Sequence, residues 1–329
     1  MMGRRRFVRA AAGAVAGGLV AGCGRRGTAT AGARAARSSP AMSAAEWSAA
    51  RRYAETSFGR VAYVERGSGD VALFLHGFPL SGFQWRGAVA RLAEDRRCLA
   101  PDFLAMGHTE VAEGASVDPG SQVSMLGELL DRLSIEAVDV IANDSGGLAA
   151  QLFLAGHPAR VRSLLLTNCD SEIDSPPPFL MPVIELAREG VFVDEVLAPQ
   201  LADPATARSA EGIAGSCYVD PAHPTDDAVE VYFGPLASSP RRKALADAFA
   251  LGLEHNPLVG LEPVLRRSTV PVRIVWGEAD TIFSPASPGY MDRTFGGSRG
   301  VRRLPDRKLF WPEELPEMID EEARRLWAG

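Results

Sequence analysis

The sequence between Val138 and Ala150 places an acidic residue in a sharp turn between a strand and a helix. The alternating, β-branched run Val138–Ile141 predicts a buried strand. Small residues at Ala142 and Gly146 let the backbones of the strand and the following helix pass close together. The middle residue of such a turn is held in a strained conformation with its side chain at the top of the sheet. That middle residue is Asp144.

This pattern is a nucleophile elbow with a carboxylate where an esterase has serine. A carboxylate nucleophile attacks an sp³ carbon and forms an alkyl ester, which points to carbon–halogen or epoxide chemistry. A shift of one place would put Ser145 in the middle and Asn143 where a small residue belongs, so we favour Asp144. An ordinary acidic N-cap is the third interpretation.

Composition is typical of one large soluble domain, alone or with an insertion. The chain has 329 residues, of which 46% are hydrophobic and 23% charged. None of its four cysteines forms a C-x-x-C pair, so neither a zinc site nor a redox motif is indicated. We expect no metal and no cofactor.

Charge is divided unevenly along the chain. Residues 1–41 hold eight arginines and no acidic residue. Of the 35 basic residues in the chain, 27 therefore remain in residues 42–329, together with all 41 acidic residues. An acidic body argues against a nucleic-acid partner.

Residues 1–45 predict a signal segment and a disordered tether outside the fold. Arg4–Arg9 reads R-R-R-F-V-R, which is similar to a twin-arginine export signal. Leu19–Cys23 resembles a lipobox, so we expect lipidation at Cys23 and an anchor outside the cytoplasmic membrane, with no other membrane contact. Translation starting at Met42 is the alternative and would leave the protein cytoplasmic.

Strands and helices alternate along most of the remaining chain, which predicts an α/β class with a mostly parallel sheet. Residues 171–262 break this alternation, so we expect a helical cap there and a core made of residues 46–170 and 263–329. The predicted elements are strands at Tyr53–Ser57, Arg60–Glu65, Val71–Leu75, Arg97–Ala100, Val138–Ile141, Val161–Thr167, Pro271–Trp276 and Val301–Leu304, and helices at Phe83–Leu92, Gln122–Leu133, Leu148–Ala155 and Glu313–Trp327.

Five motifs in this order resemble those of the α/β-hydrolase superfamily, most closely its haloalkane dehalogenase and epoxide hydrolase branch. The resemblance covers about residues 50–327 and implies an eight-stranded sheet with an inserted cap. The motifs are H-G-F-P at His76–Pro79, P-D-F-L-A-M-G-H at Pro101–His108, A-N-D-S-G-G at Ala142–Gly147, G-H-P-A-R-V at Gly156–Val161 and W-G-E-A-D at Trp276–Asp280.

The resemblance also implies roles for individual residues. Asp144 is the expected nucleophile, and the backbone N–H groups of Phe78 and Ser145 would form an anion hole. Asp280 would orient a catalytic histidine. His76 and Asp102 are expected to brace their loops.

The family's histidine is missing from its expected place. Anchoring the pattern on Pro316 puts Leu309 at that position, and leucine cannot activate water. His223 and His255 lie in the predicted cap and could in principle reach over the sheet. Epoxide hydrolases use cap tyrosines to protonate the leaving oxygen, and Tyr218 and Tyr232 lie in the matching region.

These observations favour a hydrolase that acts on a small apolar organic substrate, a haloalkane or an epoxide, through a covalent ester on Asp144. The missing histidine leaves two alternatives open. One is a lyase or isomerase with Asp144 as general base. The other is a binding protein or pseudoenzyme on the same scaffold.

Overall fold

The computed structural model describes residues 40–329. The expected export signal and lipidation at Cys23 lie outside these residues, as does most of the predicted tether. Residues 40–45 differ from that tether: Ser43 caps the helix α1 (Ala44–Ala50) through reciprocal bonds with Glu46, and Met42 is buried. The Ser-x-x-Glu spacing is a helix-start signal, but the prediction of a tether rested on the composition of the segment and did not take this spacing into account.

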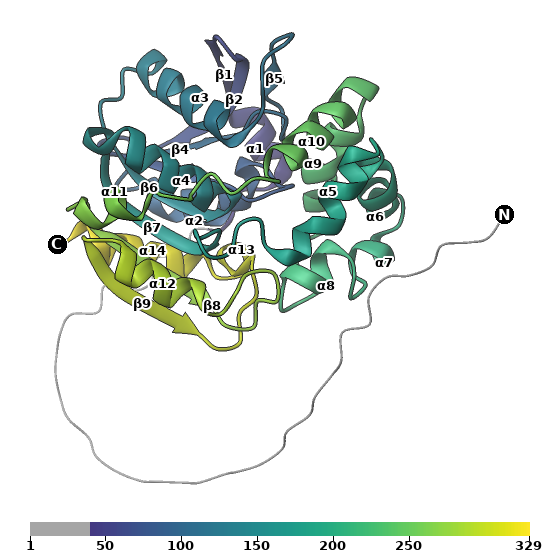
Figure 1. Ribbon diagram of the computed structural model, residues 1–329. Helices are drawn as coiled ribbons and strands as arrows, with labels where there is room; N and C mark the ends of the chain where they lie inside the picture. Colours follow the sequence, from purple (N-terminus) through teal and green to yellow (C-terminus); the bar gives the residue numbers. More distant parts are fainter. Residues whose placement is uncertain (1–39) are drawn as a thin grey trace, which may run out of the picture. The chain divides into compact units, whose positions relative to one another are not determined.

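One twisted sheet forms the centre of the fold (Figure 1). Its strand order is β1-β2-β4-β3-β6-β7-β8-β9, parallel from β4 to β9, while β2 runs antiparallel to both of its neighbours. The predicted mostly parallel sheet of eight strands is therefore confirmed, and the two-residue β5 pairs with β2 as a ninth strand. The strands are β1 (Arg51–Thr56), β2 (Gly59–Arg66), β3 (Val71–Leu75), β4 (Arg97–Pro101), β5 (Glu110–Val111), β6 (Val138–Asp144), β7 (Val161–Cys169), β8 (Val272–Gly277) and β9 (Ser298–Leu304).

Helices cover both faces of this sheet (Figure 1). Helix α3 packs on α4, and α2 packs on α14. The last predicted helix is divided in two because Pro316 has no N–H to continue a helix through Leu315. Besides α1, the α-helices outside the segment between β7 and β8 are α2 (Arg86–Leu92), α3 (Pro119–Arg132), α4 (Ser145–Gly156), α12 (Ser287–Thr294), α13 (Trp311–Glu314) and α14 (Pro316–Trp327).

The segment between β7 and β8 is mainly helical. Helix α10 packs on α5 and α9, and α9 also packs on α6. Figure 1 shows the helices α5 to α10 gathered beside the sheet, whereas α11 lies next to α4. Their position agrees with the expected insertion, although the bounds of a separate cap domain stay a prediction. The helices are α5 (Met181–Arg188), α6 (Ala198–Ala202), α7 (Pro204–Ala207), α8 (Ile213–Cys217), α9 (Asp226–Ala237), α10 (Pro240–Gly252) and α11 (Glu262–Arg267).

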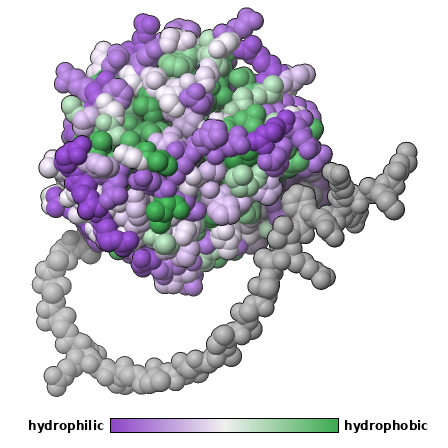
Figure 2. All heavy atoms as spheres, in the orientation of Figure 1, coloured by the Kyte–Doolittle hydropathy of each residue, from purple (hydrophilic) through white to green (hydrophobic). Residues whose placement is uncertain are grey.

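The surface of the described residues mixes polar and apolar groups. On the face drawn in Figure 2, green apolar spheres stand in small groups divided by hydrophilic ones. No helix within residues 40–329 combines the length and apolar character needed to cross a bilayer.

Candidate active site

The turn after β6 has the geometry that the strand–turn–helix pattern predicts. Asp144 adopts φ 55° and ψ −132°, while Ser145 is already the first residue of α4. A side chain at Gly146 would come within 2.3 Å of the Leu75 carbonyl oxygen. A Cβ on Gly77 would lie 2.7 Å from the Asp144 Cβ. The strained residue at the apex is therefore Asp144, and only glycine fits beside it.

Two backbone N–H groups converge on one oxygen of this carboxylate. Oδ1 of Asp144 accepts hydrogen bonds from Phe78 at 2.8 Å and from Ser145 at 2.6 Å. Burial raises the pKa of Asp144 to about 6, although both N–H groups favour the charged form. The predicted anion-hole donors thus hold Oδ1 and leave Oδ2 as the oxygen that neither donor binds.

Asp280 lies just beyond the end of β8 and is anchored by two donors. Its Oδ2 accepts from the Asn168 side chain at 2.9 Å, and its Oδ1 accepts from the Ile282 N–H at 2.8 Å. Burial raises the pKa of Asp280 to about 6. Asn168 also bonds both backbone groups of Gly277 and the Trp311 indole N–H. An amide from β7 therefore fixes the acid at the end of β8.

Leu309 lies against the elbow. Its carbonyl accepts a hydrogen bond at 3.2 Å from Asn143, the residue before Asp144, and its side chain is buried. The next residue, Phe310, packs so closely on Gly77 that an added Cβ there would lie 3.0 Å from its ring. The segment predicted to carry the histidine thus reaches the elbow with an apolar side chain. The correspondence of Leu309 to that histidine stays a prediction.

None of the five histidines, all within the described residues, bonds to Asp144 or Asp280. Both ring nitrogens of His76 bond to the backbone: Nε2 accepts from the Phe103 N–H at 3.0 Å, and Nδ1 donates to the Gly77 carbonyl at 2.9 Å. Full burial lowers the pKa of His76 to about 4, so the ring is neutral. His255 is exposed.

Asp102 ties down the loop that carries it. Its two carboxylate oxygens accept from the backbone N–H groups of Gly82 at 2.9 Å and His108 at 2.8 Å. Burial raises the pKa of Asp102 despite these bonds. The carboxylate is therefore engaged with backbone and is not directed at Asp144.

The two tyrosines selected from the sequence meet a carboxylate that sequence reasoning missed. Tyr218 and Tyr232 donate to Oε2 of Glu313 at 2.8 and 2.9 Å, and Arg86 binds Oε1. His223 stacks near the Tyr218 ring, 3.7 Å from Glu313. Burial, with Glu313 beside them, raises the pKa of both tyrosines. These hydroxyls are engaged with Glu313, and their expected role toward an epoxide stays a prediction.

Another buried carboxyl, that of Asp170, was also missed by the sequence reasoning. It directly follows β7, which lies between β6, whose last residue is Asp144, and β8, which ends three residues before Asp280. Burial, reinforced by the negative charge of Asp144, raises the pKa of Asp170 to about 8. Acidic groups thus follow three neighbouring parallel strands. The available signal was an acid at the carboxyl end of a predicted strand, where ligands bind in such sheets.

Comparisons with known proteins agree with this architecture. The family described as alpha/beta hydrolase fold matches residues 71–201. An uncharacterized hydrolase of Saccharomyces cerevisiae is 30% identical over 240 residues, which cover 69% of this chain and 80% of that protein. This chain belongs to the α/β-hydrolase family.

Within the α/β-hydrolase family, the chain is distantly similar to haloalkane dehalogenases and epoxide hydrolases. Haloalkane dehalogenase 2 of Mycobacterium tuberculosis is 25% identical over 284 residues, covering 82% of this chain and 91% of that protein. The structure of the epoxide hydrolase CorEH without ligand superposes with a TM-score of 0.68 at 20% identity, covering 84% of this chain and 98% of that one. The second likeness shows the fold alone.

Proposed function

We propose that the protein attacks a small apolar carbon electrophile, a haloalkane or an epoxide, with Oδ2 of Asp144. The observation that carries this proposal is the pair of N–H groups from Phe78 and Ser145 on the other oxygen. They fix the carboxylate in one orientation and leave Oδ2 to react. The names of the distant relatives support this class of substrate.

The first step exchanges one bond for another. Oδ2 forms a bond to the substrate carbon while the carbon–halogen bond breaks, and the halide leaves with the electron pair. With an epoxide, the ring carbon–oxygen bond breaks and the resulting alkoxide takes a proton from solvent water. Oδ1 becomes the carbonyl oxygen of the new ester and keeps both N–H donors.

The second step requires water to attack Cγ of Asp144, after which the Cγ–Oδ2 bond breaks and the product alcohol leaves with that oxygen. The developing negative charge falls on Oδ1, where the Phe78 and Ser145 N–H groups stabilise it. This water needs a base, and Leu309 offers none. We therefore expect ester formation to outpace ester hydrolysis, so that the alkylated protein accumulates.

A second candidate is a lyase or isomerase that uses Asp144 as a general base. The pKa of Asp144, raised to about 6, favours this alternative, because a general base works best when its pKa is near the ambient pH. Such an enzyme would form product without covalent attachment.

Intact-mass measurement distinguishes these functions. The full-length protein is incubated with a panel of haloalkanes and epoxides, alongside Asp144→Asn and the control Asp102→Asn. We expect a mass increment that maps to Asp144, persists in the control and is lost in Asp144→Asn. Product without an adduct would favour the general-base alternative. If neither product nor adduct appears, both enzymatic proposals are overturned and a binding protein remains.

A further inference from the structure

A cavity of about 280 Å³ lies between the start of β8, the start of β9 and the end of α14. The residues that line it are Arg273, Arg299, Glu322, Arg325, Leu326 and Gly329. Arg273 is the second residue of β8, whereas Asp280 follows the end of that strand. The cavity is therefore at the opposite end of the sheet from the candidate active site.

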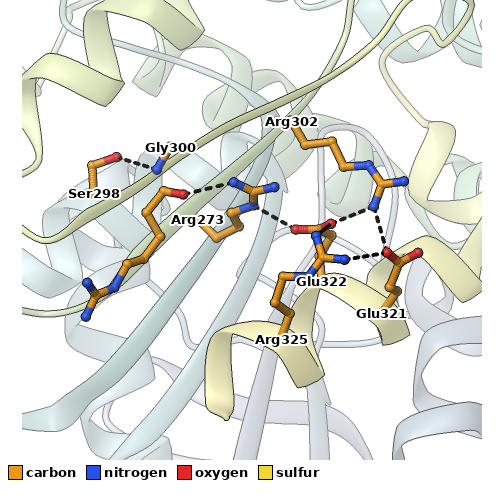
Figure 3. Close-up of polar contacts among 8 residues, drawn as sticks. Arg273, Ser298, Gly300, Arg302, Glu321, Glu322 and Arg325 are labelled. Carbon is orange, nitrogen blue, oxygen red and sulfur yellow. Dashed lines mark hydrogen bonds and ion pairs between the residues drawn. The ribbon is translucent and has the colours of Figure 1, made fainter. Parts of the chain in front are cut away.

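A buried carboxylate organises one wall of this cavity (Figure 3). The Glu322 side chain is fully buried and accepts from Arg273 at 2.7 Å, from Arg302 at 2.6 Å and from Arg325 at 2.9 Å. Burial alone would raise the pKa of Glu322, but the bonds from Arg302 and Arg273 lower it below the ordinary value. Three cations thus share this one carboxylate.

Positive charge remains in excess around the cavity. Glu321 adds a second carboxylate and accepts from Arg302 at 3.0 Å and from Arg325 at 2.8 Å. The exposed guanidinium of Arg299 makes no hydrogen bond or ion pair with any residue from 40 to 329. Three of these arginines, Arg273, Arg299 and Arg325, line the cavity against the one side-chain carboxylate of Glu322, in a protein whose body is acidic overall.

A β-bulge places Arg299 beside this network. Val272 pairs with Ser298 and Ile274 pairs with Val301, so β9 holds one extra residue there. Gly300 supplies the required backbone at φ 80°, and the Arg299 carbonyl accepts from Arg273 at 2.9 Å. The Gly300 N–H in turn donates to Ser298 (Figure 3). The bulge is thus fixed at both of its ends.

Charged edge strands also serve to prevent pairing with other chains, and that purpose alone would account for arginines along β9. It does not require a cavity, a bulge or a guanidinium without a partner. A site for an anion explains all three features together.

We propose that this cavity binds a small phosphate-bearing anion through Arg299, Arg325 and Arg273. The planar guanidinium fork matches phosphate oxygens in two-point contacts. The volume suits a small phosphorylated molecule or a phospholipid headgroup. Both sources share the same chemistry.

The test is a titration of the full-length protein with inorganic phosphate, at constant ionic strength set by chloride, followed by calorimetry. Arg299→Ala removes the unpaired cation, and Arg293→Ala removes an exposed arginine on α12 outside the cavity. Loss of a charge-assisted contact predicts binding weaker by about tenfold or more in Arg299→Ala and unchanged in Arg293→Ala. No saturable binding to the wild type, or equal weakening in both variants, would overturn the proposal.

Vesicles distinguish the two sources of phosphate. Flotation with phosphatidylcholine vesicles that contain phosphatidylglycerol compares the same two variants in the full chain, so any contribution of the N-terminal arginines cancels. Weaker flotation of Arg299→Ala than of Arg293→Ala supports a headgroup ligand. Equal flotation, with phosphate binding still dependent on Arg299, supports a soluble ligand. Asp144→Asn should leave phosphate binding unchanged, which separates this site from the proposed chemistry.

Discussion

The Phe78 N–H donates to Oδ1 of Asp144 at 2.8 Å, although the two residues are 66 positions apart in the chain. The contact joins the loop after β3 to the turn after β6, two strands that are parallel neighbours in the sheet. Together with the Ser145 N–H, it determines which carboxylate oxygen is held by the backbone and which one neither donor binds.

Leu309→His should convert a stalled reaction into turnover. The Leu309 carbonyl is already bonded to Asn143, so the backbone that would carry an imidazole is held against the residue before Asp144. A general base contributes about 10²–10⁴-fold, so we expect the ester on Asp144 to hydrolyse faster by that order. Decay of the adduct mass after removal of substrate measures the rate. Leu309→Phe is the apolar control, and an ester equally long-lived in both variants would contradict the assignment of this position.

Alkylation should depend on pH through Asp144 itself. Only the carboxylate attacks, and its pKa is raised to about 6, so the rate should be near its maximum above pH 7. It should halve at about pH 6 and fall tenfold for each further unit of acidity. Initial rates of adduct formation measure this profile. A midpoint near pH 4, the ordinary range for aspartate, would show that Asp144 does not titrate as a buried group.

Asp144→Asn should stabilise the fold at neutral pH. The pKa of this acid is higher in the folded state than in the unfolded chain, where it is near 3.8. Ionisation therefore costs stability as the pH rises from about 4, and the full cost is reached above pH 6. At 1.36 kcal/mol per pKa unit, the cost at pH 8 is about 3 kcal/mol.

Denaturant unfolding at pH 8 and pH 4 measures this effect, with the exposed Asp70→Asn as the control. The Asp144 variant should gain stability over the wild type at pH 8 and much less at pH 4. An equal gain at both pH values would point to packing instead of charge.

Glu313→Ala should destabilise the contact between the helical segment and the sheet. It leaves Arg86, whose side chain is 11% exposed, as a buried cation without its carboxylate. Removing one partner of a buried ion pair costs about 3–5 kcal/mol. Tyr232→Phe removes only one hydroxyl and should cost about 1 kcal/mol. Thermal unfolding compares the two variants, and equal losses would mean that the ion pair adds nothing beyond the hydroxyl.

Local patterns in the sequence were sufficient for most of the sheet. Val71–Leu75 is predicted with its observed bounds, because a short apolar run between turn residues has few alternatives. The elbow was also predictable, since its small residues and its acid are adjacent in the chain. Pro316 divides the last predicted helix in two, and α1, which Ser43 caps, α12 and the two-residue β5 were not predicted at all.

Contacts between distant segments could not be predicted in the same way. Tyr218 and Tyr232 lie 95 and 81 positions from Glu313, and no local periodicity specifies that they meet. Asp170 carried a usable signal, its place at the end of a strand, but only the folded sheet shows that its charge interacts with that of Asp144. A single sequence therefore predicts the strands and helices of this fold well, but it predicts poorly which polar side chains meet in the folded protein.

The bond from Asn143 to Leu309 is made to a backbone carbonyl, so it does not depend on which side chain residue 309 carries. Codons for leucine and histidine can differ in a single base. A lineage with this backbone could therefore gain or lose an imidazole beside the elbow by one point mutation, without rebuilding the loop that presents it. On the proposed mechanism, a protein that retains the bound alkyl group and one that releases it would then differ by a single base in the gene.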